Sequence, residues 1–142
     1  IQLLGTQRLK SMVAALLLSR NDPVQSMQLR QVIIRAAFCR HIARRLKDLD
    51  ENTAFTLGLL SLIGRVEGES MEALVASIPL EEDVKDALLT RNNNLGKLLA
   101  LVERFERGQM NRLSNRMLDL LNEDYLIAVA WAEALLNETD IA

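Results

Sequence analysis

Helical spacing of apolar residues runs along nearly the whole chain and constrains the fold more than any other feature. Within residues 23–49, one stripe consists of Val32, Ala36, Cys39, Ala43 and Leu46, spaced three or four residues apart. Such spacing places side chains on one face of an α-helix. No segment shows the apolar–polar alternation that is typical of a half-buried strand. The pattern therefore predicts an all-α fold.

The composition agrees with one helical domain over residues 1–142. Of the 142 residues 49% are hydrophobic and 25% charged, and only 6 are glycine and 2 proline. A chain of this size buries roughly two thirds of its unfolded surface without help from a disulfide or a structural metal. The net charge of −2 favours neither nucleic acid nor an acidic membrane as a partner. The longest apolar run, residues 12–18, is shorter than the about 20 residues of a membrane span. We therefore expect a cytoplasmic protein.

We expect a bundle of about seven helices, and turn and cap signals mark eight candidate segments. We predict them over about 6–20, 23–49, 54–66, 70–78, 81–90 and 95–107, with one through Met110, Leu113, Met117, Leu120 and Leu121 and a last one over 123–137. Asn52 or Thr53 is the expected N-cap of the third helix, and Ser70 of the fourth. Asn92, Asn93 and Asn94 predict a turn, and Gly68 is expected to end the third helix.

Two of these helices are predicted to lie in the core. The helix over 23–49 is apolar on a second face, through Ile33, Ile34, Ala37 and Phe38, so it should contact partners on two sides. The helix over 54–66 carries Gly58 and Gly64, each of which costs roughly 1 kcal/mol relative to alanine inside a helix. We interpret these glycines as points where a neighbouring helix backbone approaches closely.

The chain has one histidine and one cysteine, which limits the chemistry that it can perform. A two-histidine metal site and an internal disulfide are both impossible. No nucleophile pattern accompanies His41, so a partly exposed structural histidine is favoured over a general base. Cys39 lies on the apolar stripe and is expected to be a buried hydrophobe and not a reactive thiol. We predict no catalytic residue, no metal ion and no cofactor.

Residues 54–64 carry a resemblance to a known family. Their sequence, Ala-Phe-Thr-Leu-Gly-Leu-Leu-Ser-Leu-Ile-Gly, resembles the segment Ala-Phe-x-x-Gly-Leu-Leu-His-Asp-Ile-Gly of HD-superfamily and HDOD domains. In that family the His-Asp pair supplies metal ligands, and here the pair is replaced by Ser61 and Leu62. A further family histidine on the preceding helix aligns with Ala36. Since alanine and leucine side chains have no lone pair, the resemblance implies degenerate metal-ligand positions.

The resemblance continues through Ile78–Leu89, Leu95–Leu99 and Glu103–Gly108, which are most similar to HDOD domains fused to an EAL domain. It implies an HD/HDOD-like bundle that lacks its N-terminal helices. It also implies a non-catalytic role in bacterial cyclic di-GMP signalling. The implied partners are the EAL domain of the parent protein, a downstream regulatory protein or a second copy in a homodimer. Two alternatives stay open: a degenerate HD phosphohydrolase with residual nucleotide or phosphate hydrolysis, and a module that binds cyclic di-GMP.

Arginines gather in the second half of the helix over 23–49. Arg40, Arg44 and Arg45 are candidates for contact with a phosphate or a partner, because guanidinium forks suit phosphate recognition. Together with Arg35 and Lys47, however, they point in several directions around the helix, and acidic residues follow. A solvated, ion-paired surface is therefore the favoured interpretation. Few aromatic residues accompany the cations, so a nucleic-acid site is not expected.

A few polar and large apolar side chains have both a structural and a functional interpretation. Ser61 and Thr56 could line a relic of a metal pocket, but we expect their hydroxyls to bond to the helix backbone. Trp131, Met110 and Met117 could face a partner, but packing in the core is favoured.

Overall fold

The computed structural model describes residues 23–67 and 70–141, which form helices joined by short connections and contain no strand. The helices are α2 (Pro23–Leu46), α3 (Glu51–Glu67), α4 (Met71–Ser77), α5 (Glu82–Thr90), α6 (Asn94–Glu106) and α7 (Asn115–Ile141). This confirms the all-α prediction. The helix predicted over 6–20 and the stop at Gly68 lie outside the described residues. No helix within the described ranges is both long and apolar enough to cross a bilayer.

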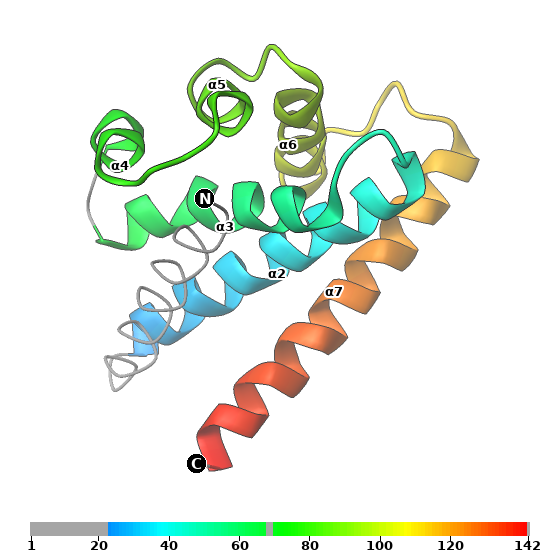
Figure 1. Cartoon of the computed structure of the whole chain (residues 1–142). Helices are drawn as coiled ribbons and strands as arrows, with labels where there is room; N and C mark the ends of the chain where they lie inside the picture. Colours follow the sequence, from blue (N-terminus) through cyan, green and yellow to red (C-terminus); the bar gives the residue numbers. More distant parts are fainter. Residues whose placement is uncertain (1–22, 68–69, 142) are drawn as a thin grey trace.

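Helix α2 is central and contacts α3, α6 and α7 (Figure 1). Both of its predicted apolar faces are buried, with exposures of 2% or less at Val32, Ile33, Ala36, Ala37, Phe38, Cys39 and Ala43. Leu46 departs from the prediction, because it is 49% exposed. It is the last residue of α2, and the following Lys47 adopts a left-handed conformation (φ 63°) that turns the chain away. The helix therefore ends before the predicted Leu49.

Helix α3 packs closely against α2 at Gly58. A Cβ atom on Gly58 would lie 2.8 Å from the Cα of Ala36 and 2.9 Å from the carbonyl oxygen of Arg35, which confirms the predicted close approach. The start of α3 differs from the prediction. Asp50 accepts hydrogen bonds from the backbone N–H of Thr53 at 2.8 Å and from its hydroxyl at 2.9 Å. Asp50, and not Asn52 or Thr53, therefore caps α3.

Helices α4 and α5 lie on the side of α3 away from α7 (Figure 1), whereas α6 contacts α7 through the rings of Phe105 and Tyr125, whose centroids are 5.3 Å apart. The predicted N-cap of α4 is confirmed, since the Ser70 hydroxyl accepts the N–H of Ala73 at 3.1 Å. The predicted asparagine turn joins α5 to α6. In that turn, the Asn93 side chain accepts the N–H of Gly96 at 2.8 Å and donates to the carbonyl oxygen of Asp83 at 2.9 Å. One side chain thus caps α6 and ties it to the start of α5.

Helix α7 corrects the prediction of two helices after Gly108. It is continuous from residue 115 to 141, a stretch that contains neither glycine nor proline to interrupt it. Ser114 accepts the N–H of Met117 at 3.1 Å at its start. Met110 and Leu113 consequently lie in the connection before α7 and not on a helix.

The long helix α7 runs antiparallel to α2 (Figure 1). Ion pairs of Arg45 with Asp124 (2.8 Å) and of Arg30 with Glu133 join the two helices. The ring of Tyr125 meets the Phe38 ring edge to face, with centroids 5.3 Å apart. Trp131 is partly buried and packs against the core, as predicted. Met117 is 40% exposed, so its prediction as a core residue was wrong.

Candidate functional site

Arg35 is a charged residue within the buried face of α2, where it is only 8% exposed. Its Nε donates to Oε2 of Glu106 at 3.1 Å, and its Nη2 donates to the other oxygen of the same carboxylate. Its Nη1 donates to the hydroxyl of Ser61 at 3.1 Å. A two-pronged contact of this kind fixes both distance and orientation. Arg35 thereby joins α2 to α6 and α3.

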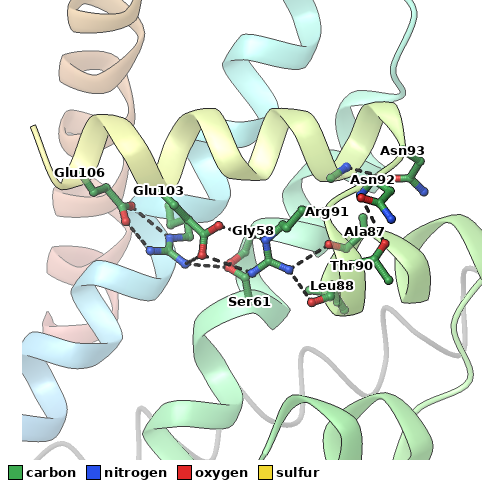
Figure 2. Close-up of polar contacts among 12 residues, drawn as sticks. Gly58, Ser61, Ala87, Leu88, Thr90, Arg91, Asn92, Asn93, Glu103 and Glu106 are labelled. Carbon is green, nitrogen blue, oxygen red and sulfur yellow. Dashed lines mark hydrogen bonds and ion pairs between the residues drawn. The ribbon is translucent and has the colours of Figure 1, made fainter. Parts of the chain in front are cut away.

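Glu103 and Arg91 extend these contacts to α5. Glu103 Oε2 lies 3.8 Å from Nη1 of Arg35, and its carboxylate accepts from Nε (3.0 Å) and Nη2 (3.2 Å) of Arg91. Arg91 also donates to the carbonyl oxygens of Ala87, at 2.9 Å, and Leu88 at the end of α5. Figure 2 shows Glu103 and Glu106 pointing from α6 toward Ser61, with Arg91 beside them. We call Arg35, Ser61, Arg91, Glu103 and Glu106 the arginine–glutamate network.

The electrostatics of the network favour the ionised form of Glu103. Burial alone would raise the pKa of Glu103, but the hydrogen bond and charge of Arg91, with the charge of Arg35, lower it below its usual value. Glu103 is therefore charged at neutral pH. Each carboxylate in the network lies against a guanidinium, so the negative charges are already neutralised by protein cations.

Of the three positions at which the family resemblance implies metal ligands, Ser61 belongs to this network, and Ala36 and Leu62 adjoin its members Arg35 and Ser61 in the sequence. Ala36 is fully buried and Leu62 is 9% exposed, and both carry only hydrocarbon side chains. The Ser61 hydroxyl donates to the Gly58 carbonyl oxygen at 2.7 Å and accepts from Arg35. Its predicted bond to the helix backbone is thus confirmed, as is that of Thr56 to Asn52 at 3.1 Å.

These residues do not fit a divalent metal ion. Two of the three positions offer no lone pair, and the adjacent Arg35 guanidinium would repel a cation. Within the described residues, no group of three or more His, Cys, Asp or Glu side chains is arranged to hold a metal ion.

The candidate arginines Arg40, Arg44 and Arg45 are not brought together in one site. The guanidinium of Arg40 stacks over the rings of Trp131, at 4.6 Å from the centroid, and Phe55, at 5.1 Å. Arg44 pairs with Glu51 at 2.6 Å, and Arg45 pairs with Asp124 at the side of α7. The predicted ion-paired surface describes Arg44 and Arg45. It was wrong for Arg35, which is buried, and for Arg40, which stacks on aromatic rings and forms no ion pair among the described residues.

His41 and Cys39 have environments that disfavour their charged forms. Burial and the nearby charges of Arg44 and Arg40 lower the pKa of His41, which is only partly exposed. Burial raises the pKa of the Cys39 thiol to about 12, outweighing the opposite effect of Arg35. The cysteine is fully buried, as predicted. A thiol in this state is a poor nucleophile at neutral pH.

Sequence reasoning missed the roles of Arg91, Glu103 and Glu106. One signal was available, because Arg35 is three residues from Val32 and four from Cys39 and so shares their apolar face. A charge on such a face requires a partner. The partner Glu106 is 71 residues away in the chain, and helix periodicity carries no information on contacts at that distance.

Comparisons with known proteins give two distant relatives. The chain is 31% identical over 106 residues to the cyclic di-GMP phosphodiesterase CdgJ of Vibrio cholerae, an alignment that covers 70% of this chain and 24% of that protein. It is 28% identical over 109 residues to the uncharacterised protein YuxH of Bacillus subtilis, with 74% of this chain and 27% of that protein covered.

The chain thus spans about a quarter of the length of each relative. No family model matches the sequence, and no solved structure does. The chain is therefore a distant homologue of bacterial proteins, one of them a cyclic di-GMP phosphodiesterase.

Proposed function

We propose that this chain is a non-catalytic, HDOD-like module of a bacterial cyclic di-GMP signalling protein and acts through protein contacts. The observation that carries the proposal is Arg35, whose guanidinium is bound by Glu106 and Ser61 next to Ala36 and Leu62. The family resemblance implies metal ligands at Ala36, Ser61 and Leu62. Here Ser61 instead binds Arg35, and the other two side chains are buried hydrocarbon. Metal-dependent hydrolysis has no ligand set at this place.

The relation to CdgJ supports the signalling context of the proposal. That relative is named as a cyclic di-GMP phosphodiesterase, and the alignment covers about a quarter of it. Under the proposal, phosphodiesterase chemistry in a protein of this type belongs to an EAL domain. This module contacts that EAL domain, a downstream regulatory protein or a second copy of itself.

Hydrolysis of cyclic di-GMP by the purified chain tests the proposal. The chain is incubated with cyclic di-GMP and Mg²⁺ or Mn²⁺, with CdgJ as the active reference, and the product is quantified by chromatography. We expect no product above a protein-free control, because the implied ligand positions carry hydrocarbon side chains. Turnover that requires the metal ion would overturn the proposal in favour of a residual phosphohydrolase.

A further inference from the structure

Two adjoining depressions form a groove between the α2–α3 turn and the α5–α6 pair. Their volumes are about 600 and 310 Å³, and both are lined by Asp48, Leu49 and Asn94. Glu81 and Asp83 line the larger depression, and Leu46 and Leu101 line the smaller one. The groove therefore has an acidic end and a mainly apolar end, which is also lined by the cation Lys97. We call it the acidic groove.

The carboxylates of the acidic groove are available for a partner. Asp48, Glu81 and Asp83 are exposed, and no Lys or Arg among the described residues forms an ion pair with them. At the apolar end, Leu46 is 49% exposed. An exposed leucine beside unpaired carboxylates suits an occupant that combines cations with apolar side chains.

The chain carries such a segment in residues 107–117, which comprise the connection from α6 to α7 and the first three residues of α7. Arg112 and Arg116 are exposed, and neither forms an ion pair among the described residues. Between and beside them, Leu113 is half-buried and Met117 is 40% exposed. We call residues 107–117 the basic connection.

The acidic groove and the basic connection lie at the same end of the bundle. Helix α2 ends at Leu46 beside the first turns of the antiparallel α7, where Arg45 pairs with Asp124 (Figure 1). An acidic and a basic surface on one end of a molecule are self-complementary, since a two-fold rotation places each against the other. In a two-fold dimer, the contact between the acidic groove and the basic connection forms twice. Each contact would then need to cover only half of the roughly 800 Å² that a stable interface takes from each partner.

We propose that the acidic groove binds the basic connection of a second copy of this chain, forming a two-fold dimer. This inference rests on the proposed function as a contact module and names its surface and its partner. Asp48 and Asp83 face Arg112 and Arg116 of the other copy, while Leu46 and Met117 contribute the apolar contact. Because the charged contacts are exposed, the dimer weakens as the salt concentration rises.

Sedimentation velocity with a charge exchange tests the dimer. Asp48→Lys with Asp83→Lys reverses the groove, and Arg112→Glu with Arg116→Glu reverses the connection. Each double variant alone is expected to dimerise at least about tenfold more weakly than the original chain, because like charges then oppose each other. An equimolar mixture of the two restores the dimer, because both contacts in the mixed pair are again attractive.

The control variant, Glu72→Lys with Asp86→Lys, makes the same charge change at exposed carboxylates outside the groove. It is expected to dimerise like the original chain. Circular dichroism verifies that all variants are folded. A chain that stays monomeric at every concentration overturns the proposal. The proposal is also overturned if the control and groove variants lose the same dimerisation strength, or if the equimolar mixture stays monomeric. Cyclic di-GMP hydrolysis is assayed on the same samples. A monomeric chain without hydrolysis refutes only the dimer, whereas metal-dependent hydrolysis refutes the proposed function.

Discussion

Arg35 occupies a buried position in which an unpaired charge would be strongly destabilising. Its guanidinium has a carboxylate on one side and a hydroxyl on the other, and Glu103 lies 3.8 Å from Nη1. Burying charges costs desolvation energy, which offsets the attraction between them. The main effect of the network is therefore to fix how α2, α3 and α6 are oriented, and not to add net stability. The loss of one member leaves its partners uncompensated, which makes Arg35 the most sensitive residue of the network.

Arg35→Met is expected to lower the free energy of unfolding by about 2–4 kcal/mol, because Glu103 and Glu106 then lack the buried cation. Arg44→Met is the matched control, since its ion pair with Glu51 is exposed and is worth less than about 1 kcal/mol. Urea unfolding followed by circular dichroism measures both. If both variants lost the same free energy of unfolding, the burial of Arg35 would have no effect on stability.

His41 provides a residue-scale test of the electrostatics. Its folded-state pKa is lowered by burial and by Arg44 and Arg40 from an ordinary value of 6.5. The unfolded chain therefore binds the proton more tightly, and stability decreases as the pH falls from 6.5 through the folded pKa. As the chain has one histidine, a single imidazole resonance in the proton NMR spectrum reports this pKa. A midpoint at or above 6.5 would contradict the environment described here.

At the scale of elements, the contact between α2 and α3 depends on the missing side chain of Gly58. A Cβ there would lie 2.8 Å from the Ala36 Cα, a backbone atom that moves only if the helices separate. Gly58→Ala gains about 1 kcal/mol in helix propensity but overpacks the contact. We expect a net loss of about 1–2 kcal/mol in chemical unfolding. Asn52→Ala, at an exposed position of α3, should change stability by less than about 0.5 kcal/mol. A stabilised Gly58→Ala variant would refute the close packing.

The elements show what the sequence can predict and where local patterns fail. Apolar periodicity identified α2 as central, and Gly58 indicated the α3 contact, because both signals are local. The break predicted within α7 was wrong, because residues 115–141 contain no proline or glycine that would interrupt a helix. The metal-ligand positions followed from the family resemblance. Their replacement by the network could not be predicted, since Glu106 and Arg35 meet only in the folded chain.

At the scale of the whole molecule, α2 joins two sets of contacts, which meet where Tyr125 of α7 packs against Phe105 of α6. On one side the arginine–glutamate network joins it to α3 and α6, and through Arg91 to α5. On the other side α7 is held by Arg45 and by the ring of Tyr125. The place where the resemblance implies a metal centre is thus a junction between helices. This arrangement suits a module that presents surfaces to partners.

A crystal structure of the chain soaked in Mn²⁺, with anomalous diffraction data, tests whether this junction can hold a metal ion. We expect Arg35 to bind Glu106 through Nε and Nη2, with no anomalous peak near Ala36, Ser61 and Leu62. The guanidinium already pairs with the Glu106 carboxylate, and Ala36 and Leu62 offer no metal ligand. A manganese peak at this junction, with Arg35 displaced from Glu106, would contradict the account.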